Sequence, residues 1–132
     1  MKFYIASGLP NAERVSLAAN VLKQSGYEHL YDWTAHRDVR SCGQKRMREV
    51  SLNETRAAAD CDLLLVLLPG GAGTHTELGI ALAGDKKRIL LWSETGEEFD
   101  DSGKTCVFYF HPAVERIQCS FEYLIKLLAE II

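Results

Sequence analysis

Residues 62–73, which read DLLLVLLPGGAG, decide the fold of this chain of 132 residues. The first seven, Asp62 and six apolar residues after it, have the length of a strand, and so continuous an apolar run is typical of a strand buried on both faces of a sheet. A proline and three glycines follow within this stretch, and beyond it an apolar helical pattern extends over about 74–84. A buried strand that leads through a glycine turn into a helix is typical of parallel α/β sheets.

The same alternation of strand and helix patterns continues on both sides of this stretch. We predict strands over 2–6, 27–33, 62–68, 88–92 and 105–110. Helices are expected over 12–25 (with Asn11 as its N-cap), 44–59 and 74–84, and a last one has Pro112 in its first turn. This order predicts an α/β fold with a five-stranded parallel sheet, a doubly wound, Rossmann- or flavodoxin-like three-layer sandwich. Residues 1–132 are expected to form one such domain.

Composition and charge exclude several classes of protein. Hydrophobic residues make up 47% of the chain and charged residues 25%, which is typical of a globular protein and not of a disordered one. The 15 basic and 18 acidic residues give a net charge of −3, which argues against a nucleic-acid polymer as partner. No apolar run approaches the roughly 18 residues of a membrane span, and the N-terminal residues indicate a strand rather than a signal peptide.

The four cysteines lie at positions 42, 61, 106 and 119, and they show neither CxxC spacing nor the Cys/His spacing of a zinc site. We therefore expect no metal and no cofactor. Reduced thiols in a chain without a signal peptide favour a soluble protein in the cytoplasm.

Charge is unevenly distributed along the chain. Residues 93–104 (SETGEEFDDSGK) hold five acids and one lysine, a net charge of −4. Residues 36–48 contain one acid, Asp38, and the basic residues Arg37, Arg40, Lys45, Arg46 and Arg48. Both stretches fit a solvated surface. The basic stretch can alternatively contact a phosphate, and the acidic one can form a lid or an interface.

The loop over 68–79, LPGGAGTHTELG, carries the most information about function. Glycines let a ligand approach the main chain closely, and the free N–H groups at the start of a helix favour an anion. A phosphate, a ribose hydroxyl or a carboxylate can be held there. Thr76 stands where the dinucleotide fingerprint needs glycine, and Gly73-Thr74-His75 replaces the Gly-Lys-Ser/Thr of a P-loop. NAD chemistry and ATP hydrolysis are therefore disfavoured.

Ligands of open parallel sheets bind beyond the carboxyl ends of the strands, where the strand order reverses. The corresponding segments of this chain are 4–10, 32–34, 68–77 and 92–98. From them we expect substrate contacts by Gly8, Asp32, Trp33, Gly70, Gly71, Gly73, Thr74 and His75. Trp33 can stack on a base or pack in the core, and His75 can reach a phosphate or remain exposed.

Glu77 stands in the first turn of the helix expected after the glycine loop. An acid there is stabilised by the helix dipole, and Thr74 and Glu77 have the spacing of a capping box. A second interpretation is catalytic, because the carboxyl group lies over the expected crevice. Ionised at neutral pH, it can attack or stabilise a sugar C1, as the cleavage of an N-glycosidic bond requires.

These features resemble the nucleoside 2-deoxyribosyltransferase family, which includes deoxynucleoside 5′-monophosphate N-glycosidases. The matching residues are the glycine loop with Glu-Leu-Gly at 77–79, Tyr4 on the first strand, and Glu54, an acid eight positions before the third strand. The resemblance implies that Glu77 is the nucleophile, that Tyr4 positions it, and that Glu54 hydrogen-bonds or protonates the base or sugar. Tyr4 can equally be an aromatic residue of the core.

Departures from the family pattern leave the reaction open. Transferases of the family often carry an acid six residues before the nucleophile, where this chain has Gly71, and Glu54 stands where the family usually has Asp. The phosphate-binding serines of the hydrolases are loosely matched, with Ser7 as the best candidate. Hydrolysis and transfer, and a nucleoside and its 5′-monophosphate, are therefore alternatives.

Other hypotheses start from the same loop. Residues 69–77 fit the PGGxGTxxE pattern of cytokinin-activating phosphoribohydrolases, which are usually longer and whose arginine-lysine motif is only echoed by Arg46-Met47-Arg48. A non-catalytic nucleotide-binding module is a further alternative. A response-regulator-like scaffold lacks its acidic pocket, because Ser7-Gly8 follow the first strand. Both resembling enzyme families cleave the N-glycosidic bond.

The expected elements use nearly the whole chain and leave few residues to close a crevice over a nucleoside. The resembling families form oligomers. We therefore expect a homodimer or larger assembly that acts on a small nucleoside or nucleotide, without a nucleic-acid polymer or a membrane as partner.

Overall fold

The centre of the fold is β3 (Leu63–Leu67), which is buried along its whole length. The computed structural model describes residues 1–36, 38–85, 87–101 and 103–131. β3 lies between β1 (Lys2–Ser7) and β4 (Arg88–Ser93), and the edges are β2 (Glu28–His29) and β5 (Val114–Gln118). All pairings are parallel, in the order β2-β1-β3-β4-β5, which confirms the predicted five-stranded parallel sheet.

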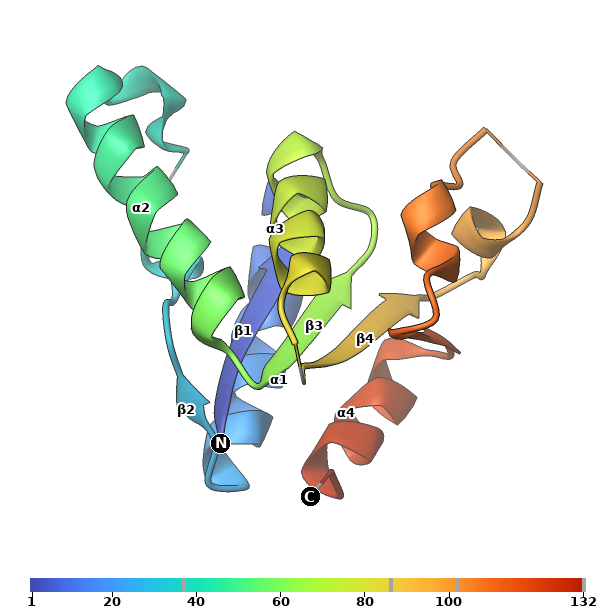
Figure 1. Cartoon of the computed structure of the whole chain (residues 1–132). Helices are drawn as coiled ribbons and strands as arrows, with labels where there is room; N and C mark the ends of the chain where they lie inside the picture. Colours follow the sequence, from blue (N-terminus) through green and yellow to red (C-terminus); the bar gives the residue numbers. More distant parts are fainter. Residues whose placement is uncertain (37, 86, 102, 132) are drawn as a thin grey trace.

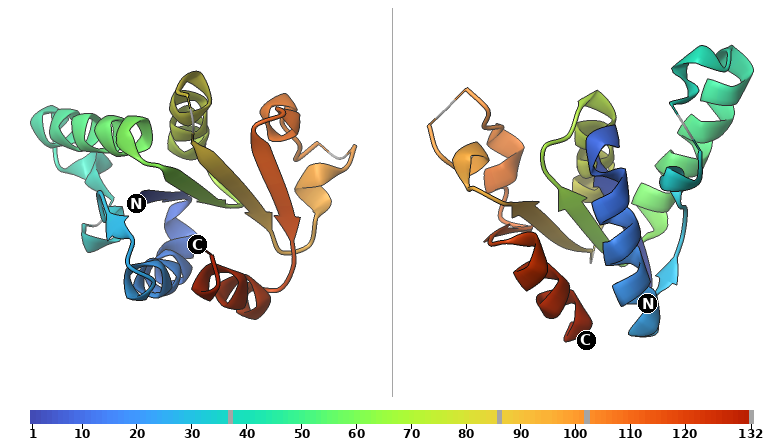
Figure 2. Two further views of the ribbon diagram at one scale, coloured as in Figure 1. Left: turned by 60° about the horizontal axis from the view of Figure 1, so that its bottom comes forward. Right: turned by 180° about the vertical axis from the view of Figure 1, so that it is seen from behind.

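Helices cover both faces of the sheet. α2 (Gln44–Asp60) and α3 (Ala72–Ala83) lie on one face, and α1 (Ala12–Gln24) and α4 (Phe121–Ala129) lie on the other (Figure 1, Figure 2). This three-layer arrangement confirms the predicted fold class. The chain moves outward from β1 to β2 and then returns past β1 to β3, so the strand order reverses between β1 and β3. A ligand crevice is expected at the carboxyl ends of these two strands.

Apolar helix faces pack against the three central strands. The predicted stripe of α1 is buried, and it consists of Val15, Ala18, Ala19 and Leu22. Leu124 and Leu128 of α4 are buried on the same face of the sheet. Burial of one such leucine contributes about 1.5–3 kcal/mol to the stability of the fold. The packed helices therefore hold the central strands, and with them the residues at the carboxyl ends of these strands, in fixed positions. None of the described helices is both long and apolar enough to cross a membrane.

The second strand is shorter than predicted. The sequence indicates a strand over 27–33, but only Glu28–His29 pair with β1. The chain then turns into the 3-10 helix η2 (Trp33–Ala35), whose first residue donates its indole N–H to the carbonyl of Ile5 at 2.8 Å. Trp33 is buried by this contact, so packing of one aromatic side chain replaces strand pairing here.

The prediction for the C-terminal part of the chain is wrong. Residues 105–110 form no strand, and η5 (Val107–Phe110) is a 3-10 helix. The fifth strand is β5, which lies inside the stretch predicted as helix, and α4 begins only at Phe121. Ser120 caps α4 by accepting a hydrogen bond from the N–H of Tyr123 at 3.2 Å. Pro112 therefore lies before β5 and not in the first turn of a helix.

The error has a physical cause. Val114, Ile117 and Phe121 continue the helical spacing of the apolar residues in α4, so periodicity alone extends the helix through β5. An edge strand is only partly covered, and Glu115 and Arg116 are exposed in the middle of β5. Glu115 instead forms an ion pair with Arg88 of β4 at 2.9 Å, across the two paired strands.

α3 begins earlier than predicted. Gly71 precedes its first residue, Ala72, and provides no side-chain cap. Thr74 is therefore inside the helix, and Glu77 lies in its second turn. The capping-box interpretation of Thr74 and Glu77 is wrong, so helix capping does not account for the acid at position 77.

Candidate active site

A cavity of about 480 Å³ opens at the carboxyl ends of β1 and β3, where the strand order reverses. Its walls come from the loop after β1, from α2 and α3, and from the segment that contains η2 and η3 (Val39–Ser41). The lining residues are Ser7, Gly8, Leu9, Pro10, Trp33, His36, Asp38, Val39, Arg40, Val50, Glu54, Gly71, Gly73, Thr74 and Glu77. The volume suits a small organic ligand.

Glu77 lines this cavity, and Tyr4, which is not among the lining residues, contacts Glu77 from within the core. Tyr4 is fully buried in the middle of β1, and its hydroxyl donates a hydrogen bond to Oε2 of Glu77. Glu77 itself is 7% exposed. A buried tyrosine hydroxyl and a buried carboxyl group each need a hydrogen-bond partner, and here they satisfy each other. Tyr4 is thus both a core aromatic and a contact that orients the Glu77 carboxyl group.

Burial changes the protonation of Glu77. Loss of water around the carboxyl group raises its pKa to about 8, the hydrogen bond from Tyr4 opposes this shift, and the nearby charge of Glu54 adds to it. The expectation that Glu77 is ionised at neutral pH is therefore wrong for the free protein. Burial raises the pKa of the Tyr4 hydroxyl, and the charge of an ionised Glu77 raises it further. The Tyr4 hydroxyl therefore stays a proton donor.

Glu54 provides a second carboxyl group in the cavity. It lies on α2 and is half-buried against the site. Burial raises its pKa, while the neighbouring His36 lowers it. A carboxyl group with a raised pKa can donate a proton to a leaving group at moderately acidic pH.

The three glycines of the loop have different roles. A Cβ on Gly70 would lie 2.4–2.6 Å from the side chain of the buried Thr74, so only glycine fits there. A Cβ on Gly71 or Gly73 would meet nothing within 4 Å, and both residues line the cavity. Gly70 therefore serves packing, and Gly71 and Gly73 leave room for a ligand beside the main chain.

The loop after β1 is joined to the loop after β3 by a set of hydrogen bonds. The hydroxyl of Ser7 donates to the carbonyl of Leu67 at 2.6 Å, and the amide of Asn11 donates to Ser7 Oγ at 3.0 Å. The N–H of Gly8 donates to the carbonyl of Pro69 at 3.3 Å. Asn11 is the N-cap residue of α1, as predicted, but its side chain makes no capping bond because it is used in this junction. The junction fixes one wall of the cavity.

Of the two substrate contacts predicted at the end of the second strand, Trp33 lines the cavity and Asp32 does not. Trp33 lines the cavity and is held by its bond to β1. Asp32 is not among the lining residues, because its carboxylate caps η2 by accepting the N–H of Thr34 at 3.0 Å.

Gly70 and His75 line a second cavity on the opposite side of α3 instead of the first. This cavity has a volume of about 510 Å³ and lies between α3 and the segment that contains η4 (Glu97–Phe99) and η5. His75 Nδ1 is 2.7 Å from the carbonyl oxygen of Gly71, and Nε2 is 2.7 Å from the hydroxyl of Tyr109. The predicted role of His75 as a contact to ligand phosphate in the first cavity does not fit this placement.

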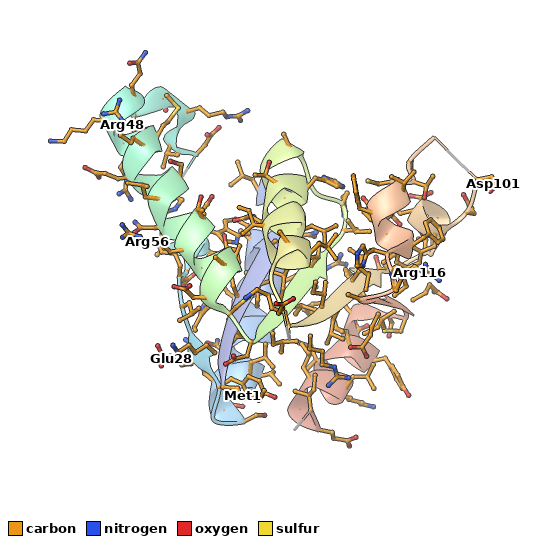
Figure 3. The ribbon with its side chains drawn as sticks, viewed as in Figure 1. Met1, Glu28, Arg48, Arg56, Asp101 and Arg116 are labelled. Atoms are coloured by element: carbon orange, nitrogen blue, oxygen red, sulfur yellow. The ribbon has the colours of Figure 1, made fainter. Side chains whose placement is uncertain are left out.

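Sequence reasoning missed four residues on one wall of the first cavity. His36, Asp38, Val39 and Arg40 line it from the segment around η3. The cluster of basic residues over 36–48 is the signal that points to this wall, although Arg40 is paired with Asp38 at 2.9 Å. Arg48 lies near the far tip of α2 in Figure 3 and does not line the cavity. Arg37 lies outside the described residues.

Other chemical groups at the site narrow what it can do. Among the residues that the structure describes, no group of three His, Cys, Asp or Glu side chains is placed to hold a metal ion. Within the described part of the chain, three carboxyl groups line the first cavity, and Asp38 is paired with Arg40. The other two, Glu77 and Glu54, are close enough for the charge of Glu54 to raise the pKa of Glu77. Two carboxyl groups with raised pKa values suit acid–base and nucleophilic chemistry at a sugar carbon.

Comparisons with known proteins find a likeness in fold. No protein-family model matches the chain, and no curated protein matches it either. The structure is similar to that of the CMP N-glycosidase BcmB from Clostridium botulinum, with a TM-score of 0.66, 21% identity and 97% of both chains covered. It is also similar to a conserved protein from Enterococcus faecalis V583, with a TM-score of 0.62, 19% identity, and 97% of this chain and 96% of that chain covered. At these identities the likeness shows a shared fold.

Proposed function

We propose that this protein cleaves the N-glycosidic bond of a nucleoside or nucleoside 5′-monophosphate, with Glu77 as the nucleophile. The observation that carries the proposal is the buried Glu77 carboxyl group, which is hydrogen-bonded by Tyr4 and faces a cavity that Glu54 also lines. The resemblance of the Glu77, Tyr4 and Glu54 positions to the nucleoside 2-deoxyribosyltransferase family supports the same roles. The fold that the chain shares with a CMP N-glycosidase is consistent with this activity.

The chemistry proceeds in two displacements at C1′ of the sugar. The Glu77 carboxyl group first loses its proton to water. The resulting carboxylate attacks C1′, the C1′–N bond breaks, and its electron pair leaves with the base. Glu54 donates a proton to the departing base or hydrogen-bonds to the sugar. Water then attacks C1′ and gives a proton to the Glu54 carboxylate, and the C1′–O bond to Glu77 breaks and releases the sugar. A second base in place of water gives transfer.

The anionic part of a nucleotide has a suitable place in the same cavity. Gly71 and Gly73 leave the main chain at the start of α3 open to a ligand, and the helix dipole favours a negative charge there. Ser7, at the end of β1, and Arg40, in η3, also line this cavity. We propose that a phosphate or sugar hydroxyl binds in this part and that Trp33 contacts the base or sugar.

Product analysis tests the proposal. Cytidine 5′-monophosphate, other nucleoside 5′-monophosphates, nucleosides and deoxynucleosides are incubated with the protein, with and without a second free base, and released base is measured by chromatography. We expect release of base that falls by about a thousandfold or more in Glu77→Gln, because the nucleophile is removed. Glu122→Gln, which changes an exposed acid in the first turn of α4, is the matched control and should keep full activity.

Two results contradict the proposal. One is the absence of released base with every substrate, and the other is full activity of a folded Glu77→Gln variant. Stabilisation of the protein by a nucleotide without turnover supports the non-catalytic binding module instead. The phosphoribohydrolase alternative is weakened because Arg46 and Arg48, which echo the motif of those enzymes, do not line the cavity.

We further propose that the active form is a homodimer or larger assembly in the cytoplasm. Val107, Phe108 and Phe110 of η5 are 48–78% exposed, and large apolar side chains gathered on one short helix are typical of a contact surface. Light scattering at micromolar concentration tests this, and a monomer would contradict it.

A further inference from the structure

His75 connects the two cavities that lie on either side of α3. Its backbone belongs to the first turns of α3, next to the glycine loop, but its ring lies against η5. The ring of Tyr109 lies 5.7 Å from the His75 ring, with an angle of 28° between the two planes. One side chain thus touches both the loop that lines the first cavity and the segment that closes the second.

The hydrogen bonds define which tautomer of the neutral imidazole fits the site. A carbonyl oxygen only accepts hydrogen bonds, so Nδ1 of His75 carries a proton and donates to Gly71 at 2.7 Å. In the neutral ring Nε2 is then an acceptor, and it receives the hydroxyl proton of Tyr109 at 2.7 Å. Burial raises the pKa of Tyr109 to about 12, so the hydroxyl remains a donor near neutral pH. The direction of donation is therefore from Tyr109 to His75 to Gly71.

Tyr109 is itself held firmly by other elements. Its side chain is buried, and the ring of Phe99 from η4 packs edge-on against it at 6.2 Å. Arg116 of β5 donates to the Tyr109 carbonyl at 3.3 Å and lies over the ring of Phe110 at 4.4 Å. η5 is thus held against η4 and the sheet by contacts that do not involve His75.

Gly71, by contrast, has little of its own to hold it. It has no side chain, and a Cβ placed there would meet no atom within 4 Å. Its carbonyl accepts the backbone N–H of His75 at 3.2 Å as well as the imidazole Nδ1–H. The imidazole is therefore the side chain that connects this open part of the cavity wall to the rest of the molecule.

We propose that His75 is a positioning residue, which transmits the docked conformation of η5 to the glycine loop and so sets the main chain of Gly71 for ligand binding. This rests on the proposed function only in placing the ligand beside Gly71. η4 and η5 then act on the first cavity without lining it. Their docking determines how much of the protein has the loop in the conformation that binds ligand.

Two variants remove the connection in steps. Tyr109→Phe keeps the ring and its packing and deletes one hydrogen bond, whereas His75→Ala deletes both. We expect KM for the nucleotide substrate to rise about fivefold in Tyr109→Phe and more in His75→Ala, as the loss of one or two hydrogen bonds implies, with kcat within about twofold of the wild type. In His75→Gln we expect KM within about twofold of the wild-type value, because the glutamine amide can donate to the carbonyl of Gly71 and accept from the hydroxyl of Tyr109.

Hydrogen exchange gives a readout that does not depend on turnover. The amides of residues 70–74 should exchange faster in Tyr109→Phe and His75→Ala than in the wild type, and His75→Gln should return them toward the wild-type rate. Tyr123→Phe, which alters an exposed tyrosine of α4, is the matched control and should leave these amides unchanged.

The outcomes separate this proposal from the proposed function. Unchanged exchange at residues 70–74 in both variants, or a fall in kcat with KM unchanged, overturns the positioning role of His75. Faster exchange without any base release from any substrate supports the connection and contradicts the glycosidase activity alone. Rescue by His75→Gln excludes a general loss of folding as the cause.

Discussion

The two cavities beside α3 have nearly the same volume, about 480 and 510 Å³, but their chemistry differs. In the first, the carboxyl groups of Glu77 and Glu54 have pKa values raised by burial. In the second, Glu98 accepts a hydrogen bond from Ser93, and Lys104 forms an ion pair with Glu97 at 2.9 Å. The two cavities are therefore distinguished by the surroundings of their carboxyl groups and not by their volume, and buried carboxyl groups with raised pKa values are typical of functional sites.

The two cavities also differ in what surrounds them. The first lies where the strand order reverses, and parallel α/β folds bind ligands there. The second lies toward the edge strand, and its residues hold η4 and η5 in place. Figure 3 shows Asp101 of the acidic stretch and Arg48 of the basic stretch on opposite sides of the molecule. Glu97 and Glu98 of the acidic stretch accordingly line the second cavity and not the first.

The strongest test of this difference compares Glu77→Gln with Glu98→Gln in stability. The folded protein keeps the Glu77 proton up to about pH 8, whereas the unfolded chain releases it near pH 4.5. Unfolding therefore releases a proton between these values, and the wild type loses stability as pH rises through this window. Glu77→Gln avoids the loss, so its advantage in free energy of unfolding should grow from near zero at pH 4.5 to on the order of 4 kcal/mol at pH 8.5.

Glu98→Gln should have the opposite sign. It weakens the hydrogen bond from Ser93 to a side chain that is 9% exposed, so we expect a loss of about 1–2 kcal/mol. Urea unfolding at several pH values measures both variants. The comparison fails if Glu77→Gln is destabilising at pH 8.5, or if its advantage does not change with pH.

Much of the site follows from positions in the chain. Tyr4 on the first strand and Glu77 after the third strand were predicted to lie at one crevice, because parallel neighbouring strands bring their ends together. In the structure Glu77 lines the cavity, and Tyr4 lies behind it in the core and is hydrogen-bonded to it. Their catalytic roles, and that of Glu54, stay predictions. The buried run of β3 and the glycine loop were sufficient to predict the central sheet, since a doubly buried strand has few alternatives.

What the sequence did not reveal depends on direction and on tertiary packing. His75 and Glu77 are two positions apart on a helix, which places their side chains about 200° apart around the axis, so they face different cavities. This is predictable from the sequence, because the helix expected over 74–84 already contains both residues. The cavity wall formed by Val39 and Arg40 has no periodic sequence pattern that identifies it. The edge strand β5 was missed for another reason, because its apolar residues continue the helical spacing of α4.

The glycine loop allows a second, smaller test of the boundary between the two cavities. Gly70→Ala should cost roughly 2 kcal/mol of unfolding free energy, because the new methyl group overlaps the buried side chain of Thr74. Gly71→Ala has open space and should change stability by less than about 0.5 kcal/mol. It should nevertheless weaken ligand binding, because its methyl group enters the space proposed for the ligand. Equal stability of the two variants would contradict the packing role of Gly70.

The smallest expected effect concerns Tyr4 and sharpens what separates Glu77 from an ordinary buried acid. If Glu77 must be ionised to attack C1′, kcat/KM should rise with pH to a midpoint at about 8, the pKa of Glu77 in the free protein. The hydrogen bond from Tyr4 lowers this pKa, so Tyr4→Phe should move the midpoint upward and reduce kcat/KM at pH 7 by about tenfold. Tyr123→Phe should leave the profile unchanged. A downward shift in Tyr4→Phe would mean that Tyr4 stabilises the protonated acid, and a kcat/KM that falls as pH rises through about 8 would mean that Glu77 acts as a proton donor rather than as the nucleophile.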